Sequence, residues 1–424
     1  MSVAERKYES NQKLLIVLCT AMYLAMMIGK QIFNSEIVEI QLVFNVENSI
    51  LSLANLFYYL TYAALQFALV FFISKLNLRM YLGICMVVSA ILTILIGVLG
   101  NLYGNILHLF IIFALNGLVQ AGMYGGIISI YNKHLSKKNY FNGVKIISFC
   151  TCFSLALCYG IATFFTTISR WDLGFVVAGT IMVLAGILFL VATPILVKKI
   201  HTLKEVVEDE HHEPHQVDYS APKVPLRERK GMVFFITLVA LVYFLAYVLY
   251  YAFNNWVPTL LYNNGNGISK VYSPLASIIV AFVVGLASIY SINLFMQTKR
   301  TYTLTSIFII INAVCCIALT FLYDNTASVI IFASLFLSCS KISAQPYSTV
   351  MAYKIRDVIE PGTLSFILNG CASISAGVAP TLSSLVFEAF GWQVLFVVLA
   401  LLTMVVLALT FVISKKEKKL FSKN

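Results

Sequence analysis

Long apolar segments recur along the whole chain, and they constrain its fold more than any other feature. A helix needs about 20 apolar residues to cross a hydrocarbon layer roughly 30 Å thick. Segments of that length run over residues 14–33, 50–73, 80–100, 106–131, 144–169, 173–197, 232–256, 272–295, 302–323, 328–353, 363–387 and 394–414. The pattern therefore predicts an all-α membrane protein with twelve transmembrane helices, in contact with a lipid bilayer over most of its length.

Composition and cysteine placement agree with a membrane chain. Hydrophobic residues make up 60% of the sequence and charged residues 11%, whereas a soluble domain carries about 25% charged residues. All nine cysteines fall inside predicted spans, where a thiol packs as a small hydrophobe. No nucleophile, metal-ligand or phosphate-binding motif occurs in a context that would support it. We therefore expect no enzymatic activity, no disulfide framework, no metal site and no cofactor.

Lysine and arginine residues between the spans predict the topology. They cluster before the first span and in alternate loops, whereas the opposite loops carry Glu36, Glu39, Glu47, Asp324 and Glu388. Loops rich in lysine and arginine remain in the cytoplasm, so both termini are expected to be cytoplasmic. This asymmetry accounts for the net charge of +11 without a nucleic-acid partner. The excess of lysine over arginine and the absence of a recognisable organelle-targeting segment favour a bacterial plasma membrane.

An internal repeat divides the spans into two sets of six. Tyr23–Ala25 aligns with Phe244–Ala246, and Trp171 aligns with Trp392 at the same offset of 221 residues. We predict an N-terminal six-helix bundle at residues 1–197, a cytoplasmic linker at 198–230 and a C-terminal six-helix bundle at 231–424. Two parallel repeats of this kind match the major facilitator transporters, in which the substrate binds near the membrane midplane between the halves.

The segment 251–261, YAFNNWVPTLL, resembles a motif of the organophosphate:phosphate antiporters, which include glycerol-phosphate and hexose-phosphate carriers. Trp256, Pro258 and Thr259 form the core of the resemblance. Residues 362–363 and 390–392, at the two ends of the eleventh span, are also similar to that family. The resemblance implies a transporter with the same number and order of helices.

The positions that would bind phosphate depart from this family. By the resemblance, Gly29 and Tyr250 stand where the family has two phosphate-binding arginines. Cys152 stands in place of a family histidine, and Gln66 in place of a family lysine. Loss of these ligands puts the family's phosphate specificity in doubt for this chain.

Two lysines lie inside predicted spans, where a charge costs at least about 3 kcal/mol. Lys30, near the outer end of the first span, either extends to the lipid headgroups or contacts a substrate. Lys341 lies deeper, among serines that could solvate it. No Asp or Glu falls in the middle of a span, so the interior charge is positive. The expected cargo is an anionic or zwitterionic solute, moved by exchange or uniport rather than by proton symport.

Tyrosine and amide side chains complete the predicted binding site. Asn116, Gln120 and Tyr124 share one helix face, which either lines a cavity or forms hydrogen bonds between helices. The substrate-binding candidates are Lys30, Lys341, Tyr250, Tyr251, Tyr59, Tyr62, Gln120, Tyr124, Asn255, Tyr347 and Asn369. Such groups can also hold a neutral polar solute, and a transporter-like sensor without net flux is another alternative. We expect a small-molecule substrate, no catalytic residues and a monomer.

Overall fold

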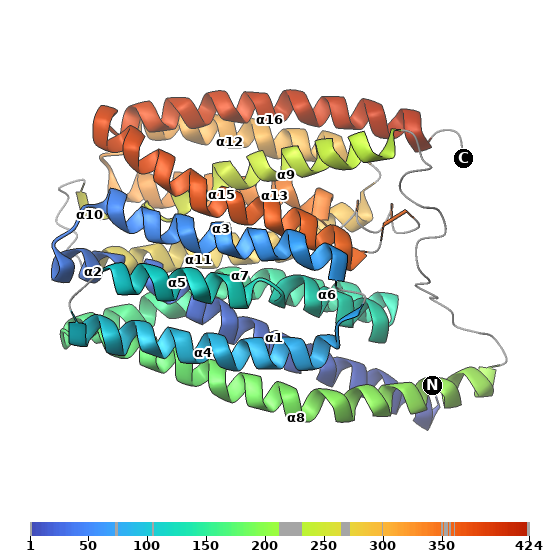
Figure 1. Ribbon diagram of the computed structural model, residues 1–424. Helices are drawn as coiled ribbons and strands as arrows, with labels where there is room; N and C mark the ends of the chain where they lie inside the picture. The colour runs from blue at the N-terminus through green and yellow to red at the C-terminus, as the bar shows by residue number, and fades with distance from the viewer. Residues whose placement is uncertain are drawn as a thin grey trace.

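The computed structural model is a bundle of long helices that lie side by side (Figure 1). It describes residues 2–72, 75–103, 106–211, 231–263, 272–298, 300–348, 351, 355, 358–359 and 361–421. Within these ranges, twelve helical segments are long and apolar enough to cross a membrane. The predicted all-α class and the count of twelve spans are therefore confirmed.

The helices of the first six spans precede residue 212, and both termini lie at the same end of the bundle (Figure 1). These helices are α1 (Val3–Ser35), α2 (Ile37–Phe44), α3 (Asn48–Phe72), α4 (Leu78–Tyr103), α5 (Ile106–Gln120), α6 (Met123–His134), α7 (Lys137–Thr167) and α8 (Trp171–His211). The later helices are α9 (Met232–Asn254), α10 (Val257–Asn263), α11 (Tyr272–Gln297), α12 (Thr301–Leu322), α13 (Thr326–Ser348), α15 (Pro361–Phe390) and α16 (Trp392–Phe421).

Several helix boundaries differ from the predicted spans, and three of the differences have a clear structural description. Helix α1 begins at Val3 because Ser2 and Glu5 form a capping box, in which each side chain accepts from the other residue's backbone N–H. The fourth span is divided into α5 and α6 at residues 121–122. Helix α8 continues to His211, into the predicted linker, while residues 212–230 of that linker lie outside the described residues.

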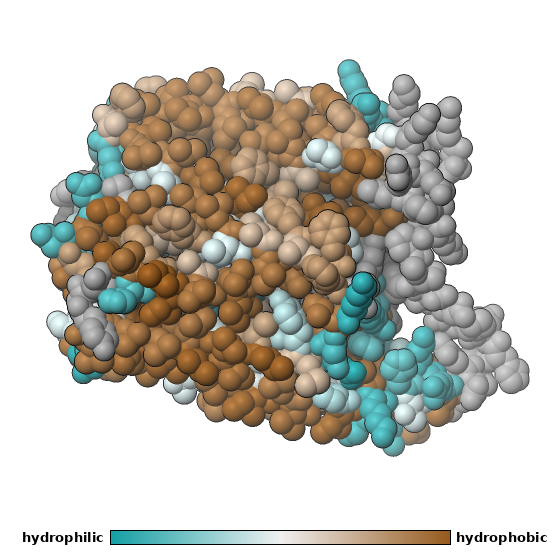
Figure 2. Space-filling view, viewed as in Figure 1, coloured by the Kyte–Doolittle hydropathy of each residue, from teal (hydrophilic) through white to brown (hydrophobic). Residues whose placement is uncertain are grey.

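The surface supports a membrane setting. Apolar side chains cover the flanks of the bundle, and hydrophilic side chains gather toward its ends (Figure 2). Large apolar residues such as Phe71 and Phe321 are 76% and 78% exposed. A soluble protein rarely shows so large a continuous apolar surface, but lipid chains cover such a surface without cost. The chain is a multi-pass membrane protein.

Close approach of α4 and α8 depends on glycine. A Cβ atom on Gly97 would lie 2.4 Å from the backbone oxygen of Asp172, and one on Gly179 would lie 2.8 Å from that of Ala90. In lipid, helices associate largely by van der Waals packing, so small residues allow their backbones to come close. These glycines therefore fix the packing of two helices within the first six spans.

Buried apolar clusters follow the two sets of spans. One large cluster runs from Met232 to Ile413 and includes only Cys152 from the earlier helices. The other two large clusters are built almost wholly from residues 15–200. Between the sets, α3 packs against α15 and α7 packs against α11. The two halves of the bundle therefore meet mainly along these two helix pairs.

All three tryptophans lie at the end of the bundle opposite the termini. Trp171 and Trp392 begin α8 and α16, and Trp256 lies in the short connection between α9 and α10. The indole Nε1 of Trp256 donates to the backbone oxygen of Pro380 at 3.1 Å. The ring of Phe387 stacks on Trp392 with centroids 4.1 Å apart and lies 5.2 Å from the ring of Trp256. Tryptophan commonly occupies the membrane–water interface in this way.

We predict that Trp256→Phe lowers the free energy of unfolding by about 0.5–1.5 kcal/mol, the net contribution of the hydrogen bond from the indole to the Pro380 carbonyl. Thermal unfolding of the detergent-solubilised protein measures this loss. Trp392→Phe, which keeps an aromatic ring against Phe387, is the control and should change the midpoint less. Equal midpoints for the two variants would show that the indole hydrogen bond contributes nothing.

Candidate functional site

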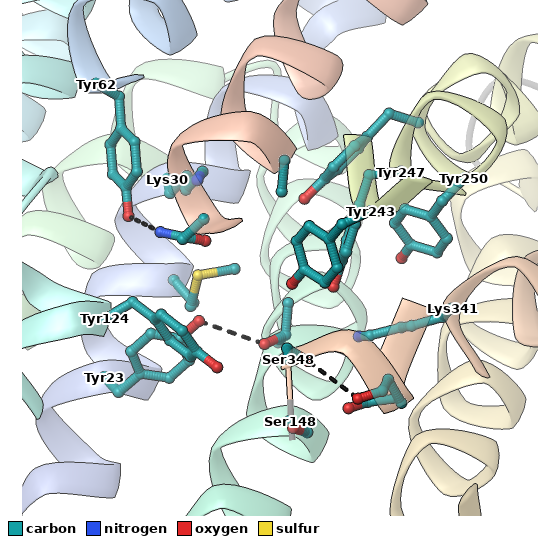
Figure 3. Close-up of a pocket in the computed structure, with 16 residues that line it drawn as sticks. Tyr23, Lys30, Tyr62, Tyr124, Ser148, Tyr243, Tyr247, Tyr250, Lys341 and Ser348 are labelled. Atoms are coloured by element: carbon teal, nitrogen blue, oxygen red, sulfur yellow. Dashed lines mark hydrogen bonds between the residues drawn. The ribbon is translucent and has the colours of Figure 1, made fainter. Parts of the chain in front are cut away.

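A central chamber lies between the two sets of spans (Figure 3). Helices α1, α3, α6 and α7 line it from one side, and α9, α13 and α15 from the other. Its volume is about 60 Å³, and a water molecule needs roughly 10–15 Å³ of such space. In this conformation the chamber therefore has room for a few waters or a compact solute.

Lys30 reaches the chamber from α1. Its side chain is buried, and its Nζ lies 4.4 Å from the ring centroid of Tyr62 and 4.6 Å from that of Tyr59. The Tyr58 ring is 5.7 Å away. Aromatic faces attract an ammonium group at such distances. Of the two alternatives left open by the sequence, extension to the lipid headgroups does not occur in this conformation, since Lys30 points inward.

Lys341 reaches the chamber from α13, in the other half. It is 4% exposed, and its Nζ donates to Cys152 Sγ of α7 at 2.8 Å. The ring of Tyr250 lies 5.8 Å from the same nitrogen. The neighbouring hydroxyls of Ser340 and Ser343 donate to backbone oxygens of their own helix. The expected solvation of Lys341 by serines is thus replaced by one thiol and one aromatic ring.

Tyrosines of α9 form one wall of the chamber. Tyr243, Tyr247, Tyr250 and Tyr251 all line it, and their spacing of three and four residues places them on one helix face. The Tyr243 and Tyr247 rings are 4.8 Å apart, and those of Tyr247 and Tyr251 are stacked at 5.7 Å. Figure 3 shows the labelled rings of this set beside Lys341. The wall offers apolar faces together with hydroxyl groups.

Contacts between the halves lie on both sides of the chamber along α15. Near the chamber, Asn369 Nδ2 donates to the Tyr62 hydroxyl at 3.3 Å. Toward the tryptophan end, Thr381 Oγ1 donates to the backbone oxygen of Ser52 at 3.4 Å. Toward the end of the bundle where both termini lie, the ring of Phe366 packs on Gly125. Contacts between the halves therefore flank the chamber on both sides along α15.

The structure brings seven of the eleven predicted residues together around the chamber. These are Lys30, Tyr62, Tyr124, Tyr250, Tyr251, Lys341 and Asn369. Tyr23, Tyr243, Tyr247, Ser148, Thr151 and Ser348 also line it and were not predicted. The spacing of the α9 tyrosines is a helix-face signal that could have indicated two of them.

The other four predicted residues lie elsewhere. Tyr59 packs its ring against Lys30 from outside the lining. Tyr347 is buried among the last six spans, with its hydroxyl 3.1 Å from Thr410 Oγ1. Asn255 caps the end of α9 and accepts from Asn254 Nδ2 at 3.2 Å.

Gln120, the fourth, belongs to a polar network between α3, α4 and α5. Its Nε2 donates to Ser89 Oγ at 2.7 Å, and the Tyr58 hydroxyl donates to its Oε1. Asn116 joins the network by accepting from Ser89 at 2.6 Å. For Asn116 and Gln120, the alternative of hydrogen bonds between helices is therefore the observed one. Tyr124, beyond the break at residues 121–122, lines the chamber.

Charge in the chamber is of one sign. Lys30 and Lys341 come from opposite halves, and none of the residues found to line the chamber is an aspartate or a glutamate. In their protonated forms, two amines that face one enclosed space without a carboxylate repel each other. An anion placed between them would be attracted to both.

Comparison with known families agrees with the arrangement of helices. The family model of the Major Facilitator Superfamily matches residues 19–379. The chain belongs to the Major Facilitator Superfamily. Members of this superfamily are secondary transporters, so the chamber between the halves is the place where a substrate is expected. No match was found among curated proteins. Within the Major Facilitator Superfamily, the resemblance to the organophosphate:phosphate antiporters stays a prediction.

Proposed function

We propose that the protein carries a small organic anion through the central chamber by alternating access. The pairing of Lys30 and Lys341, one from each half and without a carboxylate among the lining residues, is the observation that supports this proposal. An embedded amine is costly in a membrane and is retained where it has a functional partner. A carboxylate or a phosphorylated group is a suitable partner for both amines.

The position of the two lysines suggests how binding drives the cycle. In alternating access, one half rocks against the other around the site. Repulsion between the two amines disfavours bringing the halves together when the chamber is empty. An anion bound by both lysines removes that repulsion and links the halves. The closed conformation is then favoured only with cargo, since a ligand shifts an equilibrium toward the state that it binds better.

The mode and the location of transport are part of the proposal. With no carboxylate among the lining residues to relay a proton, exchange or uniport is favoured over proton symport. The lysines and arginines near the terminal end support cytoplasmic termini, in the plasma membrane of a bacterium. We propose that the carrier works as a monomer, since each chain contains both halves of the chamber.

Ligand-dependent thermal stabilisation of the purified protein tests the proposal. A ligand that binds only the folded state raises its stability by about 2.7 kcal/mol at a hundred times its Kd. We expect phosphorylated or carboxylated metabolites to raise the unfolding temperature, and neutral analogues of the same size to leave it unchanged. Stabilisation by neutral solutes alone would contradict the anion proposal and favour a neutral cargo held by tyrosines and amides. A bound ligand without flux in proteoliposomes would favour the sensor.

A further inference from the structure

The carboxyl group of Glu36 is buried where α1 meets α2, at the end of the bundle opposite the termini. Glu36 follows the last residue of the first span and is 1% exposed. Among the described residues, neither of its carboxylate oxygens has a hydrogen-bond partner. An ionised carboxylate buried without a partner is far more costly than a neutral acid. The sequence places Glu36 in an acidic loop, so this burial is a property that only the structure shows.

Helix α8 is shaped to receive this side chain. A Cβ atom on Gly174 would lie 2.8 Å from Glu36 Oε1, so the carboxyl group rests against the bare backbone of α8. Any larger residue at this position would have to displace the acid or move the helix. The glycine therefore provides the space in which the carboxyl group is shielded from water.

The charged groups around Glu36 do not stabilise its ionised form. Asp172 of α8 and Glu39 of α2 both act on it with negative charge. Arg170 is already engaged, because it donates to both oxygens of Asp172 at 2.9 and 2.8 Å. From α7, the nearest titratable side chain is the Cys158 thiol, which donates to the backbone oxygen of Ile28 at 3.3 Å, about two turns before Glu36 on α1, and brings no positive charge.

Two further polar side chains near this end of α1 do not supply a positive charge that pairs with Glu36. From α3, the amide of Asn55 donates to Asn34 at 2.7 Å. Lys30 lies six residues earlier on α1, roughly 9 Å along the helix axis at 1.5 Å per residue, and its amine packs on tyrosine rings. Burial first, and then the charges of Glu39 and Asp172, raise the pKa of Glu36 to about 9.

We propose that Glu36 is a proton-binding site of the carrier. The carboxylic acid is held when α1 packs against α8 as in this structure. When the tryptophan end of the bundle opens, the O–H bond breaks, the proton passes to water and the carboxylate becomes hydrated. The proton enters and leaves at the same end, outside the chamber, so none is carried across the membrane. The site thus goes beyond the proposed anion transport: it makes the balance between conformations depend on the pH at one face.

The direction of the pH effect follows from linkage. Between pH 4.5, the ordinary pKa of a glutamate, and about 9, the folded protein holds a proton that the unfolded chain releases. Raising the pH through this window therefore lowers the stability of the folded protein. Glu36→Gln keeps the shape of the neutral acid and removes the titration. Its unfolding temperature is expected to fall less with rising pH than that of the parent protein.

Infrared spectroscopy of the full-length protein in lipid nanodiscs tests the site without any substrate. We expect a carbonyl-stretch band of a protonated carboxylic acid at neutral pH that disappears as the pH is raised through about 9. The band should be absent from Glu36→Gln and present in Glu39→Gln, the control one helical turn away. A Glu36→Gln spectrum identical to that of the parent protein would overturn the proposal.

Two additional measurements keep the test decisive. If Glu36→Gln does not fold, Gly174→Ala serves instead, since its methyl group would displace the acid toward water and shift the loss of the band to lower pH. An unshifted band in that variant contradicts the site.

The unfolding temperature is also compared in sodium and choline buffers. Stabilisation specific to sodium would show that Glu36 binds a metal cation rather than a proton. Because no readout uses a transported solute, failure here leaves the proposed anion transport standing, and the converse also holds.

Discussion

Lys341→Ala is expected to lower the affinity for a stabilising anion by roughly 10- to 150-fold. The reason is the loss of one hydrogen bond to a charged group, which contributes about 1.5–3 kcal/mol, and each 1.4 kcal/mol corresponds to a tenfold change. Lys30→Ala should have a similar effect from the other half of the chamber. The concentration of ligand needed for half-maximal thermal stabilisation measures both changes.

The controls separate a specific contact from a general loss of positive charge. Lys341→Arg keeps the charge and should retain more of the affinity than Lys341→Ala. Lys145→Ala removes a half-buried lysine of α7 that does not line the chamber, and it should leave the affinity unchanged. If Lys145→Ala weakened binding as much as Lys341→Ala, the chamber would not be the anion site.

Gly117→Ala is expected to destabilise the protein by about 1–3 kcal/mol or more, the usual cost of overpacking a buried contact. A Cβ atom on Gly117 would lie 2.3 Å from the backbone oxygen of Tyr58 and 2.9 Å from Thr61 Oγ1. A backbone carbonyl cannot move aside cheaply, so α5 would be pushed away from α3. Thermal unfolding in detergent measures the effect.

Gly160→Ala is the matched control, because nothing lies within 4 Å of a Cβ atom at this position of α7. Alanine is favoured over glycine in helices by up to about 1 kcal/mol, so this variant should be neutral or more stable than the parent. The two substitutions are chemically identical and differ only in their neighbours. A loss of stability in Gly160→Ala equal to that in Gly117→Ala would show that the close approach is not the cause.

The fold could be predicted from the sequence because lipid imposes a simple rule, that a spanning helix must be long and apolar. The positions at which the helices begin and end depend on local interactions instead. The early start of α1 rests on the capping box of Ser2 and Glu5, and the extension of α8 to His211 continues past the apolar stretch. Neither feature changes the hydropathy by which spans are found.

The lysines of the site could be predicted because a charged side chain inside a span costs free energy and therefore indicates a functional role. Polar side chains gave a weaker signal. Gln120 and Tyr124 share a helix face in the sequence, yet Gln120 bonds to Ser89 while Tyr124 lines the chamber. A polar side chain that bonds to a neighbouring helix and one that faces a cavity occur at the same spacing in the sequence, so the sequence does not distinguish them. Glu36 shows the same limit, since burial against Gly174 depends on how α1 meets α8.

The placement of the three tryptophans gives the carrier a built-in optical probe. Trp171, Trp256 and Trp392 all lie at one end of the bundle, and none lines the chamber. Intrinsic fluorescence therefore reports on the environment of that end and stays silent about contacts with the bound cargo. Quenching by a water-soluble agent such as acrylamide should rise when this end opens, because Trp171 and Trp256 are now shielded from solvent. The direction in which the carrier faces can thus be followed in real time, without a label and before any cargo is known.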